Sequence, residues 1–478
     1  NFMVNLLEGG GLESVEVHTP VLELFNALNK TFNRYEGDAV NGFTHQTSRE
    51  MLDELGLAGE QYRFACYNVL ESSKSSLAIH QLISFFRQAI NHLDRAIKRN
   101  KREDGMYHSY NLLELTEGSA RVSRLYEMLE GQVAVLSAGS LAPYEALQVL
   151  DALKGSAMYR ADQYSYMLYP DRQLPSFLKK NTWPEEKKNS SKLVSSLLKN
   201  GDRSLIEQDN NGGIHFNGSI HNADDVLRLL ESLKESEHYR DLVEEETELF
   251  LDVFEEMFDH QSFTGRSGTF YGYEGLGSIY WHMVSKLLMA TQENLVWAKE
   301  SSASDEVIGR LIEHYYEIRA GIGINKSPEL YGAFPTDPYS HTPGNAGAQQ
   351  PGMTGQVKED VINRWAELGV VINEGCVTFD PFFMRRIEFL KQPAQFTYTA
   401  VSGDRKTINL EADSLAFTYC QVPVVYVASK EERLVVQHAS GESTSSKDQT
   451  LSREDSECLL KRNGQIECIT VYLVPGLK

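Results

Sequence analysis

Apolar residues recur every three to four positions over most of the chain, and this spacing predicts a largely helical protein. The clearest case is the segment 78–97, whose apolar residues would form one buried face of a helix. The segment 276–295 is apolar on nearly every side, which is typical of a helix buried all round. Similar spacing predicts further helices around 122–136, 226–233, 242–257 and 307–315. Between Thr19 and Gly369 we expect roughly ten to twelve helices and little strand.

The last predicted helix of this region has its apolar residues at Val357, Val361, Trp365 and Leu368. These positions lie on one side of a helix, so we expect them to form its buried face.

The pattern changes after Gly369. Phe396, Tyr398 and Ala400 alternate with threonines, which is the period of a strand with one buried face. A hairpin turn is predicted at 402–404, and further strands at 415–420, 422–427, 434–437 and 466–473. The sequence therefore predicts a mainly α domain over 1–370 and a small β-sandwich or barrel over 371–478.

Five predicted loops are rich in Gly, Asn, Tyr and His. Such loops are typical of a site assembled on a rigid scaffold, and we expect them to converge. They cover 35–46, 102–111, 208–222, 264–277 and 331–355.

Composition excludes several classes of protein. The net charge of −21 argues against a nucleic-acid groove, and no stretch approaches the roughly 20 apolar residues that span a bilayer. Five widely spaced cysteines form no zinc pattern, so we expect reduced thiols, a cytoplasmic protein and no metal site. The chain opens with Asn1 rather than Met, which leaves room for a processed leader or an upstream domain.

The most distinctive stretch runs from His341 to Gly369. A loop rich in Gly and amide residues leads into a helix that starts near Thr354 and Gly355. The free N–H groups and positive dipole end of such a helix can bind an anion, and His341 would add a cation. An ordinary N-cap at Thr354 explains the same residues, so both interpretations stay open.

The stretch 353–381, followed by strands, resembles the end of the helical barrel in glycoside phosphorylases of the cellobiose phosphorylase type. The matching positions are Thr354, Gly355, the helix 356–368, Gly375, Phe379, Asp380 and Pro381. The helix 274–293 behind a Gly- and Tyr-rich loop also resembles a late barrel helix of that family. The resemblance implies an (α/α)6 toroid, the six-hairpin glycosidase-like fold, in which Thr354 and Gly355 help to bind phosphate.

The chain departs from that family in two places. It lacks the Asp-Trp-Asn-Asp loop that carries the general acid, and Tyr273 stands where the phosphate-binding histidine is expected, with His282 deeper in the helix. A phosphorylase, a hydrolase and a protein without activity therefore all stay open.

Glycoside cleavage needs a carboxylic acid that protonates the departing oxygen. Three loop carboxylates are candidates for this step. Asp104 lies beside Tyr107, His108 and Asn111, although an Asp-Gly turn explains it equally. Glu274 follows Tyr271 and Tyr273, and Asp337 starts a turn before Gln349 and Gln350; the tyrosines and glutamines are typical of sugar binding.

We therefore expect a carbohydrate-active enzyme that cleaves or transfers a glycosidic bond of an oligosaccharide by inversion. Inorganic phosphate is the one co-substrate envisaged, and no other cofactor is expected. The resemblance also allows a homodimer. The alternative is a catalytically inactive glycan-binding or scaffolding relic of the fold, since a fold does not fix an activity.

Overall fold

The computed structural model describes residues 2–68, 73–170, 177–258, 279, 281–322, 325–327 and 357–474. In these residues the chain forms sixteen α-helices and several small sheets, and about half of the described residues are helical. The protein is thus mainly helical, as predicted. The predicted division into 1–370 and 371–478 stays a prediction.

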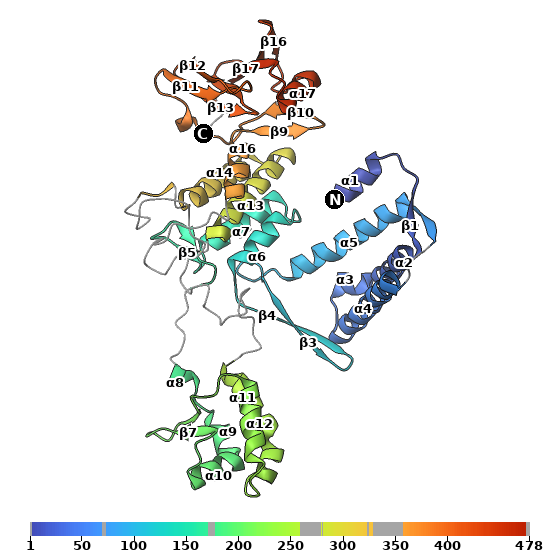
Figure 1. The fold of residues 1–478 in the computed structure, drawn as a ribbon, viewed down its shortest axis with the longest axis vertical. Helices are drawn as coiled ribbons and strands as arrows, with labels where there is room; N and C mark the ends of the chain where they lie inside the picture. The colour runs from blue at the N-terminus through green and yellow to red at the C-terminus, as the bar shows by residue number, and fades with distance from the viewer. Residues whose placement is uncertain are drawn as a thin grey trace.

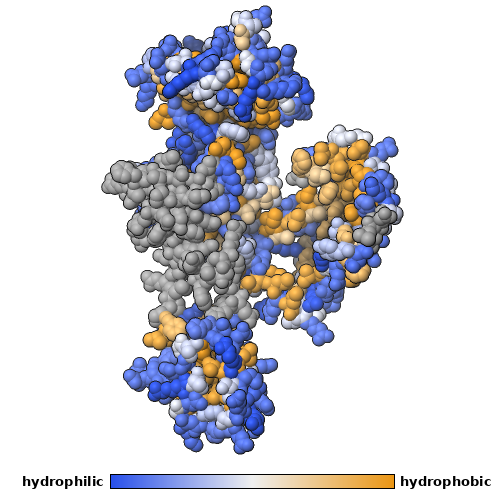
Figure 2. Space-filling view, viewed as in Figure 1, coloured by the Kyte–Doolittle hydropathy of each residue, from blue (hydrophilic) through white to orange (hydrophobic). Residues whose placement is uncertain are grey.

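The N-terminal part combines helices with two antiparallel strand pairs, β1–β2 and β3–β4. Its core is small, and large apolar side chains such as Phe64, Tyr67 and Leu93 are exposed. Figure 2 shows apolar residues on the surface of this part, whereas the two ends of the molecule are mostly hydrophilic. The elements are α1 (Phe2–Gly9), β1 (Ser14–His18), α2 (Thr19–Arg34), α3 (Glu36–Asn41), α4 (His45–Asn68), β2 (Lys74–Ala78), α5 (Ile79–Arg99), β3 (Asn111–Thr116) and β4 (Ser119–Arg124).

The predicted helix over 122–136 is wrong in its first half. Residues 119–124 form strand β4, in which Val122 pairs with Leu113 of β3, and the helix begins only at Leu129. The sequence Ser-Ala-Arg-Val-Ser-Arg has the small and alternating side chains of an exposed hairpin strand, and Val122 matched the helical spacing by coincidence. Among the described residues before Gly369 the strands β1 to β8 have two to six residues each, so strand is a minor part of this region, as expected.

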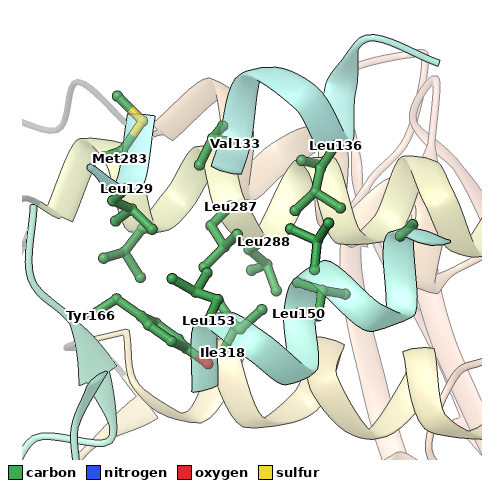
Figure 3. Close-up of a cluster of buried hydrophobic side chains, with 14 of the residues drawn as sticks. Leu129, Val133, Leu136, Leu150, Leu153, Tyr166, Met283, Leu287, Leu288 and Ile318 are labelled. Carbon is green, nitrogen blue, oxygen red and sulfur yellow. The ribbon is translucent and has the colours of Figure 1, made fainter. Parts of the chain in front are cut away.

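Four helices form the central core. They are α6 (Leu129–Ser137), α7 (Pro143–Lys154), α13 (Trp281–Glu300) and α14 (Asp305–Ala320), with the short strands β5 (Tyr159–Arg160) and β6 (Ser165–Tyr166) beside them. Leu129, Leu153 and Leu287 meet in its interior (Figure 3). Helix α13 is buried along most of its length, as its sequence predicted.

Residues 177–258 have a hydrophobic core of their own. Trp183 lies at its centre, with its ring 4.8 Å from that of Phe250 and 5.3 Å from that of Phe216. Figure 1 shows this lobe at the opposite end of the molecule from the C-terminal sheet. Its elements are α8 (Phe177–Lys180), α9 (Glu185–Ser190), α10 (Lys192–Asn200), β7 (Ile206–Gln208), β8 (Ile214–Phe216), α11 (Ala223–Leu233) and α12 (Arg240–Phe258).

The C-terminal strands follow the predicted alternation closely. A five-stranded sheet has the order β13-β14-β17-β15-β16, with β14 and β17 parallel and the other neighbours antiparallel. The elements are α16 (Val357–Glu367), β9 (Val370–Asn373), β10 (Cys376–Phe379), β11 (Ala394–Thr399), β12 (Arg405–Leu410), β13 (Ser414–Tyr419), β14 (Val422–Ala428), β15 (Arg433–His438), β16 (Ser443–Ser446), α17 (Arg453–Lys461) and β17 (Ile466–Leu473).

The junction between α16 and the sheet is tight. Gly369 has a φ of +66°, and a Cβ at this residue would lie 2.0 Å from the carbonyl carbon of Asp380. The Asp380 N–H donates to Gly369 O at 2.7 Å, and the buried Tyr426 hydroxyl of β14 donates to Leu368 O. A residue with a side chain therefore cannot occupy position 369 without moving the strand segment.

Candidate active site

The predicted buried face of helix α16 is wrong at two of its positions, whereas Leu368, just after the helix, is buried as predicted. Val361 and Trp365, expected in its buried face, are 44% and 49% exposed. Glu359, Asn363 and Glu367, which share the polar side of the helix, are instead buried. Burying polar groups costs free energy unless they are paired. A helix that turns its polar side inward therefore indicates either a buried network of polar side chains or a site that binds a polar ligand.

The polar stripe of α16 is satisfied at one end only. Glu367 accepts hydrogen bonds from the Tyr315 hydroxyl at 2.7 Å and from Arg364 at 2.6 Å, and it pairs with Arg319 Nε at 2.9 Å. Burial and the Glu367 charge raise the pKa of Tyr315, which keeps its hydroxyl protonated as a donor. Glu367 is therefore a structural carboxylate.

Towards the start of α16 several buried polar atoms have no hydrogen-bond partner among the residues that the structure describes. Asn363 is 3% exposed and neither atom of its amide makes a hydrogen bond; the same holds for Glu359 Oε2. The fully buried Ser285 hydroxyl of α13 is also without a partner. Each such group costs about 1–3 kcal/mol, so their retention together points to a ligand or water that completes them.

Helices α13 and α16 are neighbours that run in the same direction. At one end His282 Nε2 of α13 lies 3.7 Å from Glu359 Oε1 of α16. At the other end Lys299 forms an ion pair with Asp380. The backbone N–H of Asp380 donates a hydrogen bond to the carbonyl oxygen of Gly369, just beyond α16. The chain therefore enters both helices at one end of the pair, where their dipoles add positive potential.

This arrangement places Ser285 and Asn363 at a similar height. Ser285 follows His282 by three residues and Asn363 follows Glu359 by four, so each lies one turn inward from the His282–Glu359 contact. The four side chains form a polar seam between the helices, and we call it the α13–α16 seam.

Asp104 lies in the loop between α5 and β3. Its carboxylate accepts hydrogen bonds from Arg102 Nε and Nη2 and from the Met106 N–H, and Gly105 has a φ of +85°. The hydrogen bond from Arg102 is the main reason why the pKa of Asp104 is lowered. These contacts are those of a capped Asp-Gly turn, and an ionised carboxylate has no proton to donate at neutral pH.

The neighbours of Asp104 are held by the surrounding backbone and side chains. Tyr107 is buried, and its N–H donates to Gln132 Oε1 of α6 at 2.8 Å. A ring nitrogen of His108 lies 3.1 Å from Leu125 O, and Asn111 donates to Asn100 Oδ1 at 3.1 Å. The expectation that they bind sugar is untested, but their contacts serve the loop itself.

The remaining predicted site residues lie outside the described residues. They are Glu274, Asp337, Tyr271, Tyr273, Gln349, Gln350, His341, Thr354 and Gly355. Residues 264–277 end shortly before α13, and 331–355 end shortly before α16, so both predicted loops lead to the end of the helix pair that holds His282 and Glu359.

Sequence reasoning missed most of the α13–α16 seam. Glu359, Asn363 and Glu367 stand four residues apart, but the usual rule assigns such a polar stripe to solvent. Ser285 and the buried Lys326 carried no signal, because single polar residues at helix and loop positions are common.

A groove of about 870 Å³ lies beside the C-terminal sheet, between β15, β16 and α17. Its described lining is rich in hydroxyl and carboxyl groups and includes no Trp, Tyr or Phe. Sugar rings bind most strongly against such aromatic faces, so the described lining of this groove lacks one common feature of a glycan site.

Within the described ranges, no group of three or more His, Cys, Asp and Glu side chains could hold a metal ion. No helix among them is long and apolar enough to cross a bilayer.

Part of the chain matches the model of a known protein family. The family model for the GH149 phosphorylase insertion domain 2 matches residues 174–261, which is the lobe with its own core around Trp183. No curated protein was found to match the chain. The match supports a glycoside phosphorylase-like family for this chain.

Proposed function

We propose that the chain is a glycoside phosphorylase-like enzyme that cleaves a glycosidic bond of an oligosaccharide at the entry end of α13 and α16. The observation that carries the proposal is the polar side of α16, which is turned inward with Asn363 and Glu359 incompletely bonded. Amide and carboxylate groups of this kind bind sugar hydroxyls, which both donate and accept hydrogen bonds. The GH149 insertion-domain match gives independent support.

The proposal also includes the arrangement of the helices and of the C-terminal strands. Helices α13 and α14 form an antiparallel hairpin, and α16 packs against α13 and runs parallel to it. Parallel inner helices joined through antiparallel outer ones are what an (α/α)6 toroid requires. We extend this pattern to the toroid and to a C-terminal β-sandwich.

The proposed chemistry is phosphorolysis with inversion. A phosphate oxygen attacks the anomeric carbon, the bond to the leaving oxygen breaks, and a carboxylic acid gives that oxygen its proton. We assign the acid to Glu274, with Asp337 as the alternative, because Asp104 is held ionised by Arg102. Phosphate would bind at Thr354, Gly355 and His341, and the sugar at Tyr271, Tyr273, Gln349 and Gln350.

The test is a screen of oligosaccharides with and without inorganic phosphate, in which sugar 1-phosphate and free sugar are both measured. We expect sugar 1-phosphate of inverted configuration only when phosphate is present. Glu274→Gln should lower this rate on the order of a hundredfold or more, whereas Asp104→Asn should change it by a few-fold at most.

Two outcomes would replace the proposal. Cleavage that needs no phosphate and releases only free sugar would indicate a hydrolase with a second carboxylate that activates water. Binding of oligosaccharides without any turnover would indicate the catalytically inactive relic.

A further inference from the structure

The observed rotation of α16 about its axis leaves apolar side chains in contact with solvent. Val361, Ile362 and Trp365 are 44%, 44% and 49% exposed. The Trp365 ring packs edge-on against Tyr419 of β13, with 6.1 Å between the ring centroids, yet half of the residue stays exposed. The opposite rotation would bury these side chains, which is favourable in itself. Polar contacts must therefore contribute to holding the helix as it is.

Arg364 makes two such contacts, and it stands next to Asn363 in the sequence. Its Nη1 lies 2.6 Å from Oε2 of Glu367, one turn further along α16, and its Nη2 lies 2.6 Å from Oε2 of Glu388. Burial opposes the charge of Arg364, but the hydrogen bonds from its guanidinium to Glu388 and Glu367 outweigh that effect and raise its pKa. A planar guanidinium that bridges two carboxylates has a fixed orientation, so these bonds restrict how Arg364 can lie.

Glu388 is anchored to the C-terminal sheet. It ends the short 3₁₀ turn Arg386–Glu388, and the next residue, Phe389, is 6% exposed in the apolar core of the C-terminal strands. Leu390 then exchanges two backbone hydrogen bonds of 2.8 Å with residues 413 and 414, where β13 begins. Among the described residues, Arg364 is the ion-pair partner of Glu388. The Glu388 carboxylate therefore links α16 to the sheet.

The link to Glu388 also fixes the side chains of the α13–α16 seam. In a helix each residue is turned by about 100° from the one before, so Asn363 keeps a constant angle to Arg364. Glu359 lies one turn before Asn363 on the same side. A rotation that carries Arg364 away from Glu388 would therefore carry both seam residues away from their buried positions.

We propose that Glu388 is a positioning residue for the α13–α16 seam, which holds α16 through Arg364 in the rotation that keeps Asn363 and Glu359 inside. The effect of this rotation on turnover rests on the proposed function. The rotation itself rests on the contacts of Arg364 and Glu388.

The direct test measures the rotation of α16 without turnover. Val361→Cys and Asn363→Cys are labelled with iodoacetamide in the full chain. Trypsin cleaves after Lys358 and Arg364, so each labelled cysteine is read in a peptide without native cysteines. Glu388→Leu removes the acceptor of Arg364 at similar side-chain size. It should speed labelling at 363 on the order of tenfold and slow labelling at 361 about threefold, because thiol reactivity follows exposure.

Two further variants separate rotation from loss of stability. Glu388→Gln keeps one acceptor oxygen for Arg364 and should give labelling rates between those of Glu388→Leu and the wild-type residue. The matched control is Glu467→Gln, which removes an exposed pair with Lys406 in the same sheet and should label like the wild type. A merely less stable protein would be labelled faster at both positions.

Turnover provides a second measurement if the chain has the proposed activity. Glu388→Leu should raise the KM for the oligosaccharide on the order of tenfold and change kcat less than about threefold, because displaced seam residues weaken binding of substrate and transition state alike. A loss of folded protein would instead lower kcat at unchanged KM. Glu467→Gln should change neither constant.

The outcomes distinguish this inference from the proposed function. Labelling rates that stay equal to the wild type, or that rise at both positions, would overturn the role of Glu388 even if phosphorolysis occurs. Opposite changes at 361 and 363 in a chain without phosphorolysis would support the positioning of α16 and remove the proposed function. Opposite changes in an active chain whose KM stays constant would overturn the link between this rotation and the site.

Discussion

Nε2 of His282 lies 3.7 Å from Oε1 of Glu359, across the first turns of two parallel helices. The second oxygen of this carboxylate is buried and makes no hydrogen bond with any residue that the structure describes. Glu359→Gln keeps the size of the side chain and removes its charge. We expect kcat/KM to fall on the order of tenfold to a hundredfold, while the melting temperature stays the same or rises. Unchanged kcat/KM would mean that Glu359 serves packing only.

A substitution at Asn363 can distinguish a structural role of its buried amide from a role in binding substrate. Its amide makes no hydrogen bond with the described residues, so Asn363→Leu should raise the free energy of unfolding by about 1 kcal/mol. The same change should lower kcat/KM about threefold to tenfold if the amide binds substrate. Val361→Ala, on the exposed side of α16, is the control for both measurements. A destabilised Asn363→Leu protein would contradict this account.

Glu367 should behave differently from Glu359. Its buried carboxylate holds Tyr315, Arg319 and Arg364, so Glu367→Ala leaves these groups without their acceptor. We expect a loss of about 3–5 kcal/mol in chemical unfolding. Glu313→Ala removes an exposed pair with Arg310 and should cost less than about 1 kcal/mol. Equal losses of unfolding free energy in the two variants would show that Glu367 stabilises the protein no more than an exposed ion pair does.

The lobe around Trp183 should fold by itself. Residues 174–261, expressed alone, should unfold in one cooperative transition, because their core is closed within the segment. Trp183 is the single tryptophan of this segment, so its fluorescence reports the transition directly. Phe250→Ala should destabilise the fragment by about 3–5 kcal/mol. A fragment without a cooperative transition would show that the lobe depends on the rest of the chain.

Lys326 should make stability depend on pH. Its pKa is about 8 in the folded protein and near the ordinary 10.5 in the unfolded chain. Between these values the unfolded chain binds more protons, so the contribution of Lys326 to the free energy of unfolding rises with pH. Compared with Lys326→Met, the wild type should gain about 1–3 kcal/mol between pH 7.5 and 10. Parallel pH profiles of the two proteins would contradict this expectation.

Elements with a regular apolar period were predictable from the sequence. The spacing over 78–97 correctly predicted helix α5, although its expected apolar face is buried only at Ile79 and Leu93 is exposed. The alternation after Gly369 correctly predicted β11 and the strands of the five-stranded sheet. Val122 shows the limit of this method, because one valine fits a helical stripe and a hairpin strand equally well. Only pairing with Leu113, which periodicity does not reveal, decides between them.

The site was harder to predict than the fold. The apolar residues of α16 were recognised, but the assumption that they face inward failed at Val361 and Trp365. A helix whose polar side binds something has the same sequence pattern as one whose polar side meets water. Lys326 could not be recognised at all, since its burial against Trp281 depends on contacts between segments far apart in the sequence.

The junction between α16 and the sheet is closely packed by Gly369, Asp380 and Tyr426. A protein engineer who exchanges the C-terminal sheet for another must therefore transfer these three residues as a set. Homologues that vary one of them without the others would be expected to carry a differently angled sheet.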